Sequence, residues 1–112
     1  MPLSLLLHCK DLAETQAFYA QLPGFTVQAS AENTLTVKAY GATLVFTAQD
    51  LWKSKPVLSG TLYITVADVD ACYAGMKDRG DLAWPLQDMP HGSREFAITD
   101  CNGYLLAFQQ QA

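Results

Sequence analysis

The chain has 112 residues, of which 50% are hydrophobic and only 16% are charged, and its formal net charge is −4. This composition excludes disorder as the main state, and the length is sufficient for one domain with a hydrophobic core. The acidic balance argues against a nucleic-acid partner, because nucleic-acid-binding proteins are more often basic.

The first half of the chain predicts a strand, a helix and a hairpin. The strand is expected over 3–9 and the helix over 12–22, with Asp11 as the N-cap. Pro23, which is followed by glycine, ends the helix because neither residue readily continues one. Two further strands are predicted in the segment LTVKAYGATLVFTAQ, where Gly41 forms the turn between them.

The second half of the chain predicts the same series. A strand is expected over 61–66, and Asp68 caps a helix that ends at Gly80. The apolar residues of this helix recur at i, i+3, i+4 and i+7, namely at Val69, Cys72, Tyr73 and Met76. The closing segment, REFAITDCNGYLLAFQQ, predicts two strands joined by a tight turn at Asn102-Gly103.

The two halves are copies of one another. The helix caps Asp11 and Asp68 lie 57 positions apart, whereas the turn residues Gly41 and Gly103 lie 62 positions apart. The second half therefore has five additional residues, and we place them before its hairpin, in 82–94. Each half reads as a strand, a helix and three strands, and this duplication is the strongest organisational signal in the chain.

The duplicated pattern, with its closing F-x-x-x-D-x-N-G-Y-x-L-x-F, resembles the vicinal oxygen chelate superfamily of glyoxalases, extradiol dioxygenases and bleomycin-resistance proteins. The resemblance covers nearly the whole chain. It implies a single α+β domain over 1–112, in which two tandem βαβββ modules, about 1–50 and 58–112, curl around a shared cavity. It also implies that a homodimer completes this cavity.

Alternation along the predicted strands separates two faces of each sheet. One face is wholly apolar and is expected to pack under the helices; its members are Leu5, Leu7, Leu44, Phe46, Leu62, Ile64, Val66, Leu106 and Phe108. The opposite, inner face is mixed and rich in hydroxyl groups; its members are Ser4, Leu6, His8, Thr43, Val45, Thr47, Thr61, Tyr63, Thr65, Leu105, Ala107 and Gln109. Apolar walls with a few hydrogen-bonding groups are typical of a ligand cavity.

The resemblance also implies four metal-ligand positions on this inner face, which His, Gln or Glu occupies in the metal-dependent relatives. They lie seven residues before each capping aspartate and four residues after each hairpin glycine. In this sequence those positions hold Ser4, Val45, Thr61 and Ala107. None of these side chains is a credible ligand for a transition metal, which requires imidazole, thiolate or carboxylate. We therefore expect no metal centre and no cofactor.

Five residues are candidates for contact with a small-molecule ligand: His8, Trp52, Tyr63, Trp84 and Arg94. Their aromatic rings can stack on a planar ligand, and the guanidinium group can receive an anion. Each candidate also has a structural interpretation. His8 is then a rim histidine without chemistry, Trp84 packs in the core beside Pro85, and Arg94 forms a structural ion pair.

The remaining reactive side chains are more simply structural. His91 lies in the additional loop, where a solvated role is common. Cys9 is predicted to be a small core residue. Three scattered cysteines without a C-x-x-C pair suit a reducing compartment. The N-terminus reads as a strand rather than a signal peptide, and no apolar run approaches the ~20 residues of a membrane span. We expect a cytoplasmic protein without a membrane partner.

Two functions from different classes follow from these observations. The first is a metal-independent protein of the bleomycin-resistance type that sequesters a small, partly aromatic molecule. The second is an enzyme on the same scaffold, such as a lyase, isomerase or dioxygenase, with displaced ligands at His8, His91 and Glu95. The four positions without metal ligands favour the first.

Overall fold

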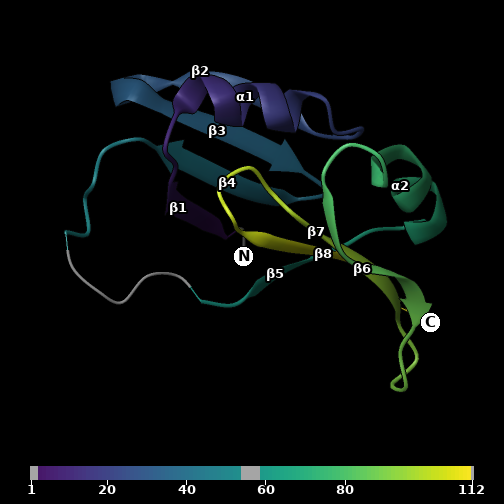
Figure 1. Cartoon of the computed structure of the whole chain (residues 1–112). Helices are drawn as coiled ribbons and strands as arrows, with labels where there is room; N and C mark the ends of the chain where they lie inside the picture. Colours follow the sequence, from purple (N-terminus) through teal and green to yellow (C-terminus); the bar gives the residue numbers. More distant parts are fainter. Residues whose placement is uncertain (1–2, 54–58, 112) are drawn as a thin grey trace. The chain divides into compact units, whose positions relative to one another are not determined.

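The computed structural model describes residues 3–53 and 59–111 (Figure 1). The chain divides into two compact units between Ser59 and Gly60. We call them module one and module two. Each contains a four-stranded sheet with one α-helix in the predicted order β-α-β-β-β. The predicted module limits at residues 1, 58 and 112 lie outside the described residues.

Module one is built on a mixed sheet with the strand order β1-β4-β3-β2. Its elements are β1 (Ser4–His8), α1 (Leu12–Ala20), β2 (Thr26–Ser30), a short 3-10 helix (Ala31–Asn33), β3 (Thr34–Ala39) and β4 (Ala42–Thr47). Strands β1 and β4 run parallel, and the other pairs are antiparallel. The helix packs on β2 and β3.

Local interactions explain the limits of α1 and of the hairpin that follows it. The Asp11 carboxylate accepts hydrogen bonds from the backbone N–H groups of Ala13 and Glu14, at 2.8 and 3.1 Å, as expected of an N-cap. The helix ends at Ala20, two residues earlier than predicted, because a tighter i to i+3 turn precedes Pro23. In the β3–β4 hairpin, Tyr40 and Gly41 both have positive φ, 52° and 82°, which makes a two-residue turn at the predicted position of Gly41.

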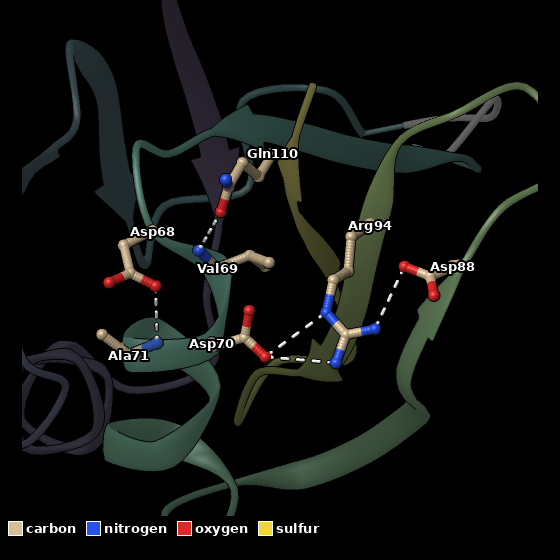
Figure 2. Close-up of polar contacts among 7 residues, drawn as sticks. All are labelled: Asp68, Val69, Asp70, Ala71, Asp88, Arg94 and Gln110. Atoms are coloured by element: carbon tan, nitrogen blue, oxygen red, sulfur yellow. Dashed lines mark hydrogen bonds and ion pairs between the residues drawn. The ribbon is translucent and has the colours of Figure 1, made fainter. Parts of the chain in front are cut away.

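Module two repeats this plan with the strand order β5-β8-β7-β6. Its elements are β5 (Thr61–Thr65), α2 (Val69–Met76), β6 (Asp81–Asp88), β7 (Arg94–Thr99) and β8 (Leu105–Gln110). Figure 2 shows how the first turn of α2 is held. Asp68 accepts from the Ala71 N–H at 3.1 Å, and the Gln110 side chain accepts from the Val69 N–H at 2.8 Å.

Helix α2 is shorter than the sequence predicts. It ends at Met76 rather than at Gly80. The last buried apolar side chain of the helix is that of Met76, and the next three residues are charged and exposed. Continuing the helix would bury no further apolar surface, so a turn closed by the Arg79 N–H and the Met76 carbonyl replaces it.

The additional residues of module two are not all placed as predicted. Thr36 pairs with Val45 in module one, and Ala97 pairs with Ala107 in module two. These β3 and β7 positions lie 61 apart, so only four additional residues precede β7. The fifth lies in the β7–β8 connection, where the Asp100 carboxylate accepts from two backbone N–H groups and stabilises a wider loop. Much of the predicted insertion is strand β6 itself.

The core of each module lies between its helix and its sheet. In module one the Tyr19 ring packs on Phe46, with centroids 5.3 Å apart, and in module two Phe96 stacks on Phe108 at 5.2 Å. The apolar face predicted from alternation is largely buried, with Leu5 and Leu62 only partly so. Cys9 is buried and free, as expected of a small core residue.

In the described part of the chain, neither α1 nor α2 has the length and apolar character that a membrane-spanning helix requires.

Candidate functional site

Four side chains from different strands converge on the inner face of module two. Tyr63 of β5 stands opposite Ala107 of β8, which stands opposite Ala97 of β7, which in turn stands opposite Trp84 of β6. The two alanines are fully buried and form the floor between the two rings. Glu95 lies one row further along β7, on the same face as Ala97 because side chains alternate along a strand.

The Glu95 carboxylate joins the two aromatic residues. Its Oε2 atom accepts a hydrogen bond from the Tyr63 hydroxyl at 3.3 Å and one from the Trp84 Nε1–H at 3.1 Å. Glu95 is only 1% exposed, whereas Tyr63 is 52% exposed. We call Tyr63, Trp84 and Glu95 the acidic cluster. It consists of a buried acid held between one ring at the surface and one ring that is partly buried.

The acidic cluster has an unusual charge balance. Among the described residues, no cationic side chain lies within ion-pair distance of Glu95, and both of its hydrogen-bond donors are neutral. Burial of the hydroxyl, together with the nearby carboxylate that accepts its hydrogen bond, raises the pKa of Tyr63 above the ordinary tyrosine value. Tyr63 therefore remains a neutral donor to Glu95.

In module one, the structure brings together two of the predicted ligand contacts. His8 lies on the inner face of β1, and its ring meets the Trp52 ring edge-on, with centroids 6.4 Å apart. Trp52 follows β4 in a turn that the Asp50 carboxylate closes by accepting from the Lys53 N–H at 2.9 Å. This turn directs the indole towards the end of β1. Trp52 is 43% exposed, so a flat side chain remains accessible at this position.

Arg94 lies apart from these groups, on the helix-facing side of β7 (Figure 2). Its guanidinium binds Asp70 of α2 and Asp88 of β6, each at 3.1 Å. Hydrogen bonds to Asp70 and then to Asp88 raise the pKa of Arg94. Since Glu95 faces inward, its neighbour Arg94 must face the opposite way. The interpretation as a structural ion pair describes its geometry, and the prediction that it contacts the ligand has no geometric support.

His91 also lies away from the acidic cluster, in the turn between β6 and β7. Its Nε2 atom forms a hydrogen bond with the Ser93 hydroxyl at 2.8 Å. The same turn is closed by a hydrogen bond from the Met89 N–H to the Ser93 carbonyl at 2.7 Å. Ser93 is buried, so this pair fixes the turn and presents no accessible nucleophile.

A comparison with protein families decides the identity of the fold. The model of the glyoxalase/bleomycin resistance protein/dioxygenase superfamily matches residues 3–108. The chain belongs to this superfamily. The resemblance predicted from the duplicated pattern is therefore confirmed. The search of curated proteins finds no match to this chain.

Solved structures of the superfamily show the same fold. A glyoxalase/bleomycin resistance protein/dioxygenase from Alicyclobacillus acidocaldarius is 23% identical, with a TM-score of 0.77, and the match covers 97% of this chain and 89% of that chain. TioX from Micromonospora sp. ML1 is 18% identical, with a TM-score of 0.79 and 97% coverage of both chains. A family enzyme from Burkholderia phytofirmans PsJN is 13% identical, with a TM-score of 0.78 and 97% coverage of both. At these identities the likeness shows the fold alone.

The positions that usually hold the metal in the superfamily do not fit a metal here. Ser4 and Thr61 each offer one weakly basic hydroxyl, while Val45 and Ala107 offer only hydrocarbon. In the register, Val45 stands opposite Leu6 and Ala107 opposite Tyr63, so no neighbour on the adjoining strand supplies a ligand instead. Across residues 3–53 and 59–111, no three His, Cys, Asp or Glu side chains are grouped as a metal site.

The prediction from sequence considered Glu95 only as a displaced metal ligand and did not foresee that it accepts hydrogen bonds from Tyr63 and Trp84. Alternation could have found it. Counting back from the hairpin, Glu95 shares its face with Ala97, and Ala97 pairs with inner-face Ala107. Of the adjacent residues Arg94 and Glu95, only one can face inward. The acid that does so is the charged residue nearest the predicted Tyr63 and Trp84.

Proposed function

We propose that this chain is a metal-independent small-molecule-binding protein that sequesters a small, partly aromatic ligand in the groove of a homodimer, without a cofactor. Its type is that of the bleomycin-resistance branch of the superfamily rather than that of the metal enzymes.

One observation carries this proposal, namely the chemistry of the four usual ligand positions. Ser4 and Thr61 occupy equivalent places on the first strands of the two modules, and Val45 and Ala107 occupy equivalent places on the last strands. A single replaced ligand is compatible with an altered metal site. Four replacements at symmetric places leave a divalent ion without its coordination shell.

The inner-face side chains support a binding role. The inner face is mostly made of short and hydroxyl-bearing side chains, and Trp52, Tyr63 and Trp84 add flat rings, of which those of Trp52 and Tyr63 are exposed. Such rings contribute about 0.5–1.5 kcal/mol per stacked contact beyond the burial of apolar area. A planar organic molecule is therefore the ligand class that these surfaces suit best.

The alternative enzyme, with displaced ligands at His8, His91 and Glu95, receives less support. The imidazole of His91 is bound to Ser93, and the carboxylate of Glu95 is bound to Tyr63 and Trp84. Across the described residues, these side chains are not grouped as the three ligands that a catalytic metal requires.

Metal analysis tests the first part of the proposal. Protein purified without chelator should contain well under one equivalent of Zn, Ni, Fe or Mn, and titration with each ion should give no saturable binding. A matched variant with Thr61→His and Ala107→Glu restores two ligand types at the usual positions and serves as the positive control. Stoichiometric metal in the unmodified protein would overturn the proposal.

Ligand binding tests the second part. The chain has two tryptophans, so Trp52→Phe leaves only Trp84 as a reporter in module two, and Trp84→Phe leaves only Trp52 in module one. A library of small aromatic compounds should include ligands that change the fluorescence of at least one single-tryptophan variant with saturable dependence. The absence of saturable binding across the library, by fluorescence and by calorimetry, would contradict a sequestering role.

The homodimer requires its own measurement. Light scattering at tens of micromolar, ~10⁻⁵ M and well above a typical specific dissociation constant, should give the mass of two chains. A monomer under these conditions would remove the dimeric groove from the proposal.

A further inference from the structure

The acidic cluster of module two contains a charge that its surroundings leave uncompensated. Glu95 is 1% exposed, and among the described residues it has no cationic partner. Two neutral donors, both on Oε2, are its hydrogen-bond partners. Burying an ionised carboxylate is costly unless an opposite charge accompanies it. A positive charge from outside the chain would supply the missing compensation.

The second oxygen of the carboxylate is available to such a charge. Neither hydrogen bond to Glu95 ends on Oε1. No fully buried polar atom without a partner occurs among the described side chains, so Oε1 keeps contact with solvent. A donor that arrives from the inner face can therefore bind Oε1 while Trp84 continues to hold Oε2.

The rings beside Glu95 suit a cation as well. Tyr63 and Trp84 stand on either side of a floor made by Ala97 and Ala107, whose methyl groups project little. Aromatic faces attract ammonium groups through their quadrupole, and the indole of tryptophan does so most strongly. Tyr63 is half-exposed, and its 3.3 Å hydrogen bond is the longer of the two, so its side chain is the one that moves when a ligand enters.

From these observations we infer that the ligand of module two is a primary or secondary organic ammonium attached to a flat apolar group. The ammonium N–H donates to Glu95 Oε1, and the flat group stacks on the exposed ring of Tyr63. This inference rests on the proposed function, since it names the class of molecule that the protein sequesters. No charged residue of module one takes part in it.

Three probes of similar size test this inference: phenethylammonium, neutral 2-phenylethanol and anionic phenylacetate. Affinities are measured by calorimetry and by Trp84 fluorescence in the Trp52→Phe protein. We expect phenethylammonium to bind at least roughly tenfold more tightly than either of the others, because it adds a charge-assisted hydrogen bond. Equal affinities for the three probes would overturn the inference.

Glu95→Gln is the decisive variant, because glutamine keeps an acceptor for Tyr63 and Trp84 but removes the charge. It should abolish the preference, so that phenethylammonium and 2-phenylethanol bind the variant with similar affinity. Asp81→Asn is the matched control. Asp81 stands opposite Thr99 on the same face of the sheet and is exposed, so its loss changes net charge equally. If Asp81→Asn reduced the preference as much as Glu95→Gln does, the preference would come from the net charge of the protein, and the inferred site at Glu95 would be wrong.

The ring substitutions add a second line of evidence. Tyr63→Phe keeps the ring and should retain most of the phenethylammonium affinity, whereas Tyr63→Ala should reduce it several-fold. A larger loss in Tyr63→Phe than in Tyr63→Ala would contradict the role of the ring. If all three probes fail but neutral compounds of the library bind, the inference fails alone. If nothing in the library binds either, the proposed function fails with it.

Discussion

The two modules share one backbone plan but distribute their large core side chains differently. Tyr19 of α1 corresponds to Met76 of α2, and Leu35 of β3 corresponds to Phe96 of β7. All four are buried. At these two pairs of equivalent positions, the aromatic ring therefore comes from the helix in module one (Tyr19) and from the strand in module two (Phe96). This comparison shows that the fold constrains the volume between helix and sheet more than the residue at any one position.

The inner faces differ in chemistry rather than in volume. The position of Glu95 in module two is that of Thr34 in module one, since Glu95 pairs with Gln109 as Thr34 pairs with Thr47. Thr34 shares a 2.6 Å hydrogen bond with the Ser30 hydroxyl and also donates to the Ala31 carbonyl. In module one, the neutral Thr34 hydroxyl thus forms hydrogen bonds with residues close to it in the chain. In module two, the Glu95 carboxylate at the equivalent position accepts from two neutral donors on other strands.

The residues flanking these positions follow the same division. Leu6 stands where Tyr63 stands in module two, and Gln28 stands where Trp84 stands. The registers of β1 with β4 and of β3 with β4 recur in β5 with β8 and in β7 with β8, while the inner-face side chains of one copy form a candidate recognition surface. A duplicated scaffold can diverge in this way because the inner face does not carry the packing between helix and sheet.

The largest expected effect is on the core of module two. Phe96→Ala should lower the free energy of unfolding by about 3–5 kcal/mol, since it removes a fully buried ring that stacks on Phe108. Urea unfolding followed by circular dichroism measures the loss. Leu82→Ala on the edge strand, where Leu82 is 40% exposed, is the control and should cost far less. Comparable losses in both variants would show that the Phe96 ring is not the centre of this core.

Removing the acid should have the next largest effect. Glu95→Ala leaves the partly buried Trp84 N–H without its acceptor and should cost about 2 kcal/mol of unfolding free energy. Thr34→Ala, the equivalent change in module one, should cost at most about 1 kcal/mol because its partners are exposed. If the order of these two losses were reversed, the contrast drawn between the inner faces would be wrong.

A core swap tests whether the two modules solve the same packing problem. Met76→Phe combined with Phe96→Leu moves the ring of module two to the helix, where module one has it. The double variant should stay within about 1.5 kcal/mol of the unmodified protein, because it nearly conserves volume. In a double-mutant cycle by urea unfolding, the two changes together should cost less than their sum. Strict additivity would mean that the two positions do not share one packing space.

The smallest effect is on a titration. The pKa of Tyr63 lies above 10.0 through burial first and the Glu95 carboxylate second. Glu95→Gln should lower this pKa but not return it fully to 10.0, because burial remains. Tyrosinate absorbance of each protein, minus that of its Tyr63→Phe counterpart, isolates this residue among the five tyrosines. A pKa that rises in Glu95→Gln would contradict the hydrogen bond.

The same shift fixes a sign for stability. The folded protein holds the Tyr63 proton more tightly than the unfolded chain does. The contribution of Tyr63 protonation to the free energy of unfolding is therefore fully present below pH 10.0. This contribution to stability decreases as pH rises from 10.0 through the pKa of Tyr63 in the folded protein. In Tyr63→Phe, the free energy of unfolding should therefore fall less steeply over this pH range.

The sequence was sufficient to predict the fold because its signals were repeated. Two capping aspartates, two hairpin glycines and two apolar strand faces agreed with one another, and each pattern appeared twice. The helix ends were placed less well, since Gly80 suggested a stop that the helix never reaches. Burial of apolar surface, rather than the next glycine, decides where such a short helix ends.

The candidate site was less accessible to prediction. Tyr63 and Trp84 were recognised as rings on the inner face or near it, but their common partner was not. Trp84 reaches Glu95 only because β6 changes register between Leu82 and Trp84 and again before Gln87. Such irregularities depend on tertiary pairing and leave little trace in local sequence patterns. The ion pair between Arg94 and Asp70, 24 residues apart, likewise depends on tertiary pairing that local patterns do not reveal.

The irregular strand β6 also affects how the protein behaves in concentrated solution. It forms one border of its sheet, and it contains Pro85, which lacks a backbone N–H group. With two register breaks as well, its outer edge offers an interrupted row of donors and acceptors. Strand β2, the corresponding border of module one, pairs in unbroken register over Thr26–Ser30 and has no proline. A strand from another molecule could therefore pair continuously with the outer edge of β2 but not with that of β6. Of these two border strands, β6 is the one protected against edge-to-edge aggregation.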